Sequence, residues 1–158
     1  IQHAKQGKKA EIMAKMNSLV DPEIIQLLYL ASQAGVKISL IIRGVCCLYP
    51  QRKDLSENIK VISIIGHFLE HSRIFWFCND NDHEVFIGSA DWMRRNLDRR
   101  IEAVTPIEDL ELKSELYSLL RTYIKDDYFA WIMKKDGSYE KSAFDSAINR
   151  SQIDLIKK

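Results

Sequence analysis

The fold is decided by two stretches that lie close together in the chain, FLEHSRIFWF at residues 68–77 and VFIGSADWMRRN at residues 85–96. The side chains at 74–77 are aromatic or β-branched, which favours a strand. The Asn-Asp-Asn-Asp run at residues 79–82 is typical of a turn, and residues 84–87 predict the returning strand. Together they predict an apolar β-hairpin.

Four polar side chains gather at one end of this hairpin. Residues two apart in a strand point to the same face, so His71 and Arg73 project together, and so do Ser89 and Asp91 just beyond the partner strand. An imidazole, a guanidinium, a hydroxyl and a carboxylate thus meet at the strand ends. Because strand ends commonly face water, composition alone favours a solvated surface over a functional site.

The order of the residues is more specific than their composition. His-x-Arg on one strand, followed by Gly-Ser-x-Asp-Trp-Met-x-Arg-Asn after the next, resembles the carboxy-terminal catalytic domain of bacterial long-chain polyphosphate kinase, a relative of the phospholipase D superfamily. Residues 15–22, 35–38, 43–48 and 97–102 support the resemblance, which runs from about Lys5 to Asp136. It implies an α/β fold, a phospholipase D-like mixed β-sheet flanked by helices, in a single domain at residues 1–158 with a peripheral tail at about 137–158.

Length and composition exclude several classes of protein. The 158 residues fit one domain with a substantial core, and a net charge of +1 argues against a dedicated nucleic-acid binder. No apolar run approaches the roughly 20 residues that cross a bilayer, and no signal peptide is recognisable. Three cysteines without a pairing pattern suit a cytoplasmic location, with peripheral association with the inner membrane as an alternative. Because the chain starts at Ile1 rather than Met, we expect it to be a fragment of a longer protein.

Hydrophobic patterning predicts a strand at residues 10–16, a helix that begins at Pro22 with Asp21 as N-cap, and a doubly buried strand at residues 36–42. This succession implies a right-handed crossover and parallel pairing. The rest of the chain predicts strands at 58–65 and 101–104, an amphipathic helix from Leu110 to Tyr123, a hairpin around residues 136–137, and a terminal helix at 142–156 capped by Ser142.

Arg43 follows directly on the second of these parallel strands. Ligand sites in open α/β sheets gather at the carboxyl ends of strands. A guanidinium offers forked donors that suit phosphate oxygens, and Gly44 would let the backbone approach a ligand closely. A lone arginine there is as often only the first solvated residue, and the resemblance favours the phosphate contact.

The resemblance also implies how the reaction is divided. In the family a histidine of a sister domain carries the phosphoryl group, and His71 matches a second histidine that faces it, as general acid or as a stabiliser that holds a proton. Histidine suits this role because imidazole titrates near neutral pH. Arg43 and Arg73 would hold ATP or chain phosphates. Arg73 stands where phospholipase D relatives carry lysine.

Weaker candidates line the same strand ends: Asn17, Ser89, Asp91 and Asn96. Ser89 would donate a hydrogen bond to phosphate, whereas Asp91 would orient His71 or pair with Arg73 or Arg94. Capping of the local structure is as good an explanation for Asn17, Ser89 and Asp91. The Arg94-Arg95 and Arg99-Arg100 pairs would form the wall of a polyphosphate channel, or simply an ordinary charged surface. His3 and His83 are expected to be solvated, His83 within the turn.

The implied substrates are ATP and inorganic polyphosphate, and the implied cofactor is Mg²⁺, whose ligands we expect outside this fragment because no convincing carboxylate set occurs in it. The implied partners are the sister catalytic domain and further copies of the complete chain. Two alternatives stay open. One is a phospholipase D-type nuclease or phospholipase half-site, active as a homodimer through paired His71 residues, against which Arg73 counts. The other is a domain without catalysis, either an anion-binding module or an oligomerisation domain.

Overall fold

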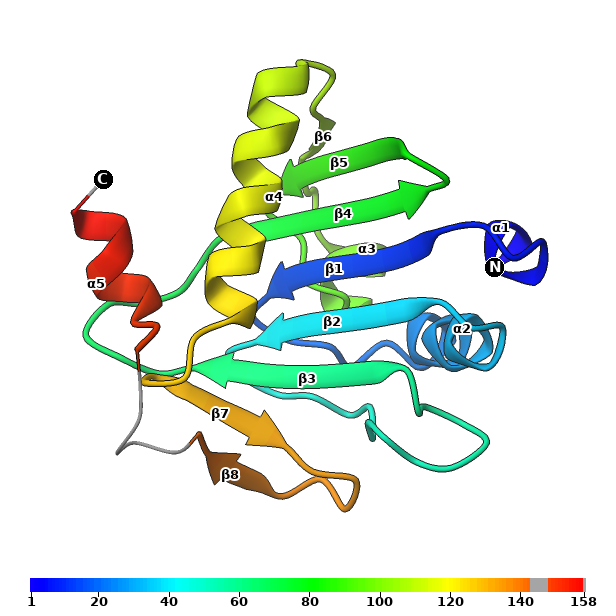
Figure 1. The fold of residues 1–158 in the computed structure, drawn as a ribbon, viewed down its shortest axis with the longest axis horizontal. Coiled ribbons are helices and arrows are strands. Elements are labelled where there is room, and N and C mark those ends of the chain that lie inside the picture. Colours follow the sequence, from blue (N-terminus) through cyan, green and yellow to red (C-terminus); the bar gives the residue numbers. More distant parts are fainter. Residues whose placement is uncertain (143–147, 158) are drawn as a thin grey trace.

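A computed structural model describes residues 1–142 and 148–157. Within them the chain forms one mixed sheet in the order β6-β5-β4-β1-β2-β3-β7-β8, flanked by helices (Figure 1). The expected mixed sheet in a single domain is confirmed. The elements are α1 Gln2–Lys5, β1 Ala10–Met16, α2 Pro22–Gln33, β2 Lys37–Ile42, β3 Ile59–Ile64, β4 Arg73–Asn79, β5 Asp82–Gly88, α3 Arg94–Arg99, β6 Val104–Pro106, α4 Leu110–Ile124, β7 Ala130–Met133, β8 Tyr139–Lys141 and α5 Ser151–Ile156.

The predicted strand–helix–strand unit is confirmed. The Asp21 carboxylate accepts a hydrogen bond from the backbone N–H of Ile24 (2.9 Å), and Pro22 begins α2, so both N-terminal features act as expected. Gly35, just after the helix, has a φ of 94°, a backbone conformation that residues with a Cβ atom rarely adopt. β1 and β2 then pair in parallel, with Ile12 opposite Ile38. Their carboxyl ends therefore lie at the same edge of the sheet.

Helices cover both faces of this sheet, and α4 crosses the near face in Figure 1. Leu28 of α2 packs in one buried cluster with Leu40, whereas Leu120 of α4 packs in a second cluster with Ile41 and Trp76. Successive residues of β2 thus enter opposite clusters, as strand geometry requires. The expectation that this strand is buried on both faces is confirmed.

The hairpin of β4 and β5 lies against β1, to which β4 pairs antiparallel. Its turn is narrower than predicted, because only Asp80 and Asn81 lie between the strands, both with positive φ. His83 is therefore a strand residue, and its ring lies 4.8 Å from that of Trp76. The prediction of a solvated His83 in the turn is wrong, and His3, half-buried in α1, is likewise not fully solvated.

In the second half of the chain, one predicted strand begins too early and one helix was missed. β6 begins only at Val104, because Ile101 is fully exposed and lies outside the strand. The short, arginine-rich helix α3 was not predicted. β3, α4 and the β7–β8 hairpin are confirmed with shifts of one or two residues at their ends.

The terminal helix is shorter than predicted. Asn149 and Arg150 are not helical, and α5 begins at Ser151. The backbone N–H of Ser142, one residue after the end of β8, donates to the carbonyl of Ala130 (3.0 Å). Residues 143–147 of the predicted helix lie outside the described residues. The segment expected to be a peripheral tail supplies β8 at the sheet edge and buries Gln152 of α5. Over the described part of the chain, no helix is long and apolar enough to cross a membrane.

Candidate active site

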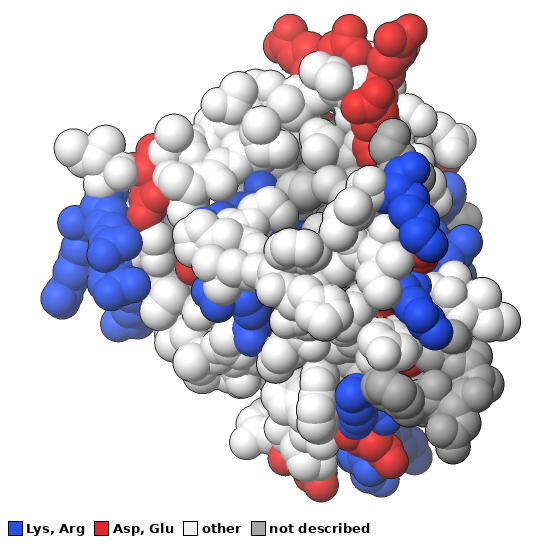
Figure 2. All heavy atoms as spheres, turned by 90° about the vertical axis from the view of Figure 1, so that its left-hand side faces the viewer, with Lys and Arg blue, Asp and Glu red and all other residues white. Residues whose placement is uncertain are grey.

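A cavity of about 490 Å³ opens where β1, β2 and β5 end and β4 begins. Figure 2 looks at this edge of the molecule, where basic atoms lie among uncharged ones. The cavity brings together every side chain that the sequence singled out as a candidate. These are Asn17, Arg43, His71, Arg73, Ser89, Asp91 and Asn96.

Asp91 is the centre of the hydrogen-bond network in this cavity. Its Oδ1 accepts from the backbone N–H of Asn17 (2.8 Å) and from the Asn17 side-chain amide (3.3 Å). It also pairs with Arg73, whose Nε lies 3.1 Å from Oδ1 and whose Nη2 lies 3.3 Å from Oδ2. Of the roles predicted for Asp91, the structure therefore shows the pairing with Arg73. Within the residues described, its carboxylate makes no hydrogen bond to Arg94 or to the His71 ring.

The local sequence explains why Asp91 reaches this position. The next residue, Trp92, stacks on Phe75 of β4 with ring centroids 5.1 Å apart. The Trp92 carbonyl accepts from the backbone N–H groups of Val20 (2.9 Å) and Asp21 (3.0 Å). The chain after β5 is thus held against the chain after β1, and the Asp91 carboxylate is directed inward, so that the residue is only 6% exposed.

Arg43 is held by one nitrogen. Its Nε donates to the Asn17 side-chain carbonyl (3.0 Å), whereas its terminal nitrogens have no hydrogen-bond partner among the described residues. The half-buried guanidinium therefore keeps a fixed direction and retains donors for an anion. Gly44 has a different role from the one expected. Its own N–H donates to the Asn17 carbonyl (2.7 Å), and a Cβ there would lie 3.0 Å from that oxygen. The close approach is thus to Asn17.

Ser89 and Asn96 both bind a carboxylate that sequence reasoning missed. The Ser89 hydroxyl and the Asn96 amide each donate to Glu102. These bonds, the one from Ser89 foremost, hold the pKa of Glu102 below its ordinary value. Because the Ser89 hydroxyl proton is engaged, Ser89 orients Glu102 in the structure as it stands. The signal in the sequence was a carboxylate two residues after the Arg99-Arg100 pair.

His71 lies in the loop that leads into β4 and is exposed. Its backbone carbonyl accepts from Arg73 Nη1 (2.9 Å), whereas its imidazole makes no hydrogen bond within the described part of the chain. The ring is therefore accessible from the cavity. Further cations line the same space: one arginine of each predicted pair, Arg95 and Arg100, faces it. Four arginines against the carboxylates of Asp91 and Glu102 give the lining of this cavity an excess of positive charge.

A metal centre does not fit the described residues. They contain no group of three or more His, Cys, Asp or Glu side chains that could hold a metal ion. The two cavity carboxylates, on Asp91 and Glu102, already accept hydrogen bonds from their neighbours. Where the ligands of a magnesium ion lie stays a prediction.

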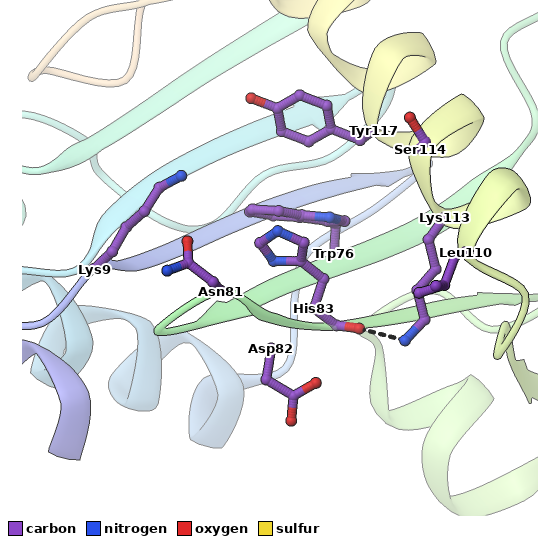
Figure 3. A pocket seen from close by; sticks show the side chains of 9 residues that line it. All are labelled: Lys9, Trp76, Asn81, Asp82, His83, Leu110, Lys113, Ser114 and Tyr117. Carbon is purple, nitrogen blue, oxygen red and sulfur yellow. Dashed lines mark hydrogen bonds between the residues drawn. The ribbon is translucent and has the colours of Figure 1, made fainter.

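A second cavity, of about 410 Å³, lies between the β4–β5 turn and α4. Figure 3 shows Trp76, His83 and Tyr117 beside it, with Lys113 Nζ donating to the His83 carbonyl (2.6 Å). None of the candidate residues lines it. The groups that the sequence selects for chemistry are all in the first cavity.

The fold is shared with phospholipase D-like proteins. A phospholipase D family member, Nuc from Salmonella typhimurium, superposes with a TM-score of 0.54 at 18% identity, covering 75% of this chain and 80% of that one. At this identity the likeness concerns the fold alone. It confirms the expected phospholipase D-like class.

Closer relatives define the family. The profile of the polyphosphate kinase C-terminal domain 2 matches residues 1–152. The polyphosphate kinase of Prochlorococcus marinus (strain MIT 9313) is 66% identical over 139 residues, which are 88% of this chain and 20% of that protein. The crystal structure of polyphosphate kinase from Porphyromonas gingivalis superposes with a TM-score of 0.93 at 40% identity, over 99% of this chain and 24% of that one. The chain therefore belongs to the polyphosphate kinase C-terminal domain family and spans about a fifth of the length of its relatives.

Proposed function

We propose that this chain supplies half of the active site of a polyphosphate kinase, which transfers the γ-phosphoryl group of ATP reversibly to inorganic polyphosphate. The observation that carries the proposal is the single cavity in which an accessible histidine, His71, lies among four arginines. Phosphoryl transfer needs positioning and neutralisation of charge more than covalent chemistry from many groups, and this cavity offers both.

The reaction divides into two transfers. A histidine of a sister domain attacks the γ-phosphorus of ATP, the bond to the bridging oxygen breaks, and ADP leaves. A terminal oxygen of polyphosphate then attacks the phosphohistidine, which restores the free imidazole. His71 faces the leaving bridging oxygen and donates a proton or a hydrogen bond to it as its charge develops. The exposure of the His71 ring and its lack of a hydrogen-bond partner within the described residues support this role.

The arginines bind the phosphates. Arg43 is the main contact, because the bond from its Nε to Asn17 fixes its direction while its terminal nitrogens have no partner among the described residues. Arg95 and Arg100 extend the positive surface along the cavity wall. Arg73, which is paired with Asp91, contributes its charge while the pair fixes the wall. Asn17 holds Arg43, and Ser89 with Asn96 holds Glu102.

The complete enzyme requires more than this chain. The nucleophilic histidine and the ligands of Mg²⁺, which accompanies ATP and shields its phosphates, are assigned to the rest of the longer protein. The short span of this chain relative to its relatives supports that division. We assign the complete protein to the cytoplasm as a homo-oligomer.

One alternative has an observation in its favour. It is a nuclease or phospholipase half-site that dimerises through His71, and the shared phospholipase D-like fold is compatible with it. The engagement of Arg73 by Asp91 opposes it, because a freely mobile cation at that position is lacking. A module that only binds anions would use the same arginines without His71.

The test gives the full-length protein γ-³²P-ATP together with polyphosphate and, in a separate reaction, supercoiled plasmid. The measurements are the label in polyphosphate, the binding of polyphosphate and the nicking of the plasmid. Label in acid-insoluble polyphosphate supports the proposal. A nicked plasmid without labelled polyphosphate supports the nuclease alternative. Binding of polyphosphate without either product supports the anion-binding module.

A further inference from the structure

A buried ion pair lies directly behind the candidate histidine. Lys15 of β1 is 1% exposed, and its Nζ lies 3.2 Å from Oε2 of Glu70, which is itself 8% exposed. The same Nζ donates to the Ser72 hydroxyl (2.8 Å). Glu70 and Ser72 are the two chain neighbours of His71. One buried ammonium thus holds both sides of the residue whose own imidazole is exposed.

The loop is tied down from a second direction by α5. The Gln152 amide donates to Oε1 of Glu70 (2.8 Å) and to the Phe68 carbonyl (2.8 Å), and its oxygen accepts from the Phe68 N–H (3.1 Å). Gln152 is 3% exposed. The start of α5 is in turn fixed by Asp126, whose Oδ2 accepts from the Ser151 N–H (2.7 Å). Side chains from two distant parts of the chain, Lys15 of β1 and Gln152 of α5, therefore converge on the loop at 68–72.

Burial of the charged Lys15–Glu70 pair has a cost in folding stability. Desolvation lowers the pKa of Lys15, which Glu70 partly offsets, while Arg43 and Arg73 lower it further. Tyr123, whose ring lies 5.0 Å from Lys15 Nζ, has a raised pKa because it is buried beside the Glu70 carboxylate. Apolar residues of similar volume in place of a buried ion pair are often as stable or more stable, so stability alone does not explain this pair.

We propose that Lys15 and Glu70 are positioning residues that fix the backbone on either side of His71 and thereby direct its imidazole into the phosphate cavity. This rests on the proposed role of His71 in phosphoryl transfer. Lys15 and Glu70 do not touch the substrate. They act through His71, because the hydrogen bonds that hold its loop in place are made at Phe68, Glu70 and Ser72.

The decisive variant of the full-length enzyme is the double substitution Lys15→Met/Glu70→Leu. It replaces the ion pair by apolar side chains of similar size, so the melting temperature should hold or rise. Ser72 nevertheless loses its bond to Lys15, Gln152 loses its bond to Glu70 and keeps those to Phe68, and His71 loses its fixed direction. We expect kcat to fall about 10–100-fold, because small misplacements of a reacting group have effects of this size. KM for ATP should stay within about twofold, since Arg43 is untouched. An unchanged kcat would overturn the inference.

A second arm shows whether the effect passes through His71. When two groups act as one unit, the effects of their substitutions are not additive. Adding Lys15→Met/Glu70→Leu to His71→Ala should therefore lower kcat no further than His71→Ala alone, within about twofold. A further full 10–100-fold loss would assign the pair a role unconnected with His71 and overturn the inference. If His71→Ala alone keeps wild-type activity, the proposed role of His71 fails as well, which separates the two failures.

Two more variants test the inference even if the double variant misfolds. Gln152→Ala loosens the same loop from α5 without disturbing the ion pair, and we expect a smaller fall in kcat, about threefold to tenfold. Lys134→Met removes an exposed ion pair with Glu140 on the β7–β8 hairpin and should leave kcat unchanged. Equal rates for Gln152→Ala and Lys134→Met would count against a positioned loop even if the double variant could not be purified.

Discussion

Arg73 and Asp91 form a two-point ion pair, with Nε–Oδ1 at 3.1 Å and Nη2–Oδ2 at 3.3 Å, and the same carboxylate accepts the backbone N–H of Asn17. The pair joins the β4–β5 hairpin to the end of β1. It also separates the tasks of two arginines that the sequence treats alike. Arg73 stiffens the cavity wall, whereas Arg43 keeps donors for an anion.

The first prediction concerns this joint. Asp91→Ala leaves the Arg73 guanidinium without its counter-charge and the Asn17 N–H without its acceptor. We expect the free energy of unfolding of residues 1–158 to fall by about 2–4 kcal/mol, as is usual when one partner of a buried pair is removed. Urea unfolding measures it. Asp98→Ala, an exposed aspartate on α3, is the control and should change stability by less than about 0.5 kcal/mol. Equal effects of the two substitutions would contradict the structural role of Asp91.

The second prediction concerns Arg43. In the full-length enzyme Arg43→Ala should lower kcat/KM for ATP at least about tenfold, because a charge-assisted hydrogen bond contributes about 1.5–3 kcal/mol. Arg43→Lys should restore only part of this, since the fork and the bond to Asn17 are both lost. Steady-state kinetics provide the measurement. Arg94→Ala is the matched control, because Arg94 is exposed and does not line the cavity. Wild-type kinetics for Arg43→Ala would contradict the phosphate contact and indicate that Arg43 is only a solvated surface residue.

The sequence predicted the sheet and the membership of the cavity because both depend on local patterns. Alternating apolar residues and the Asp21-Pro22 start define β1, α2 and β2, and the positions where strands end place Arg43 and His71 at one edge. Errors occur where the pattern is short. α3 has six mostly polar residues and no apolar stripe, and Ile101 reads as a strand residue but is fully exposed.

The sequence could not assign partners within the cavity. The pairing of Asp91 with Arg73, rather than with His71 or Arg94, depends on side-chain distances in the folded protein. The spacing of residues along the sequence does not determine these distances. Glu102 was missed because an exposed glutamate beside arginines is typical of any surface. Lys15 was missed because a lysine within a strand is usually solvated, and its burial follows from a tertiary contact with Glu70.

The third prediction concerns the adjacent cysteines. Burial raises the pKa of Cys46 from 9.0 to about 11, whereas Cys47 is exposed. At pH 8 this shift lowers the thiolate fraction of Cys46 about 100-fold, so Cys46 should react with iodoacetamide far more slowly than Cys47. Because the raised pKa belongs to the folded state, Cys46 favours folding at neutral pH and this contribution is lost as pH rises from 9 through 11. Mass spectrometry of Cys46→Ser and Cys47→Ser variants measures the rates, and similar rates would contradict the burial of Cys46.

The fourth prediction concerns residues 1–158 alone. The purified chain should fold but should form no polyphosphate from ATP above background, because the nucleophilic histidine is assigned to a sister domain. Incorporation of ³²P into acid-insoluble product measures this. Sustained synthesis by the isolated chain would overturn the proposed division of the active site.

The most direct test of the account is the His71→Ala variant of the full-length enzyme, with polyphosphate synthesis and melting temperature measured on the same preparation. Synthesis should fall about 10²–10⁴-fold, the usual contribution of general acid–base catalysis, while the melting temperature stays within about 2 °C because the His71 ring is exposed. His67→Ala, at another exposed histidine, should keep the wild-type rate. His83→Ala should lower the melting temperature instead, since that ring packs on Trp76. Normal turnover by folded His71→Ala enzyme would contradict the central claim that His71 takes part in phosphoryl transfer.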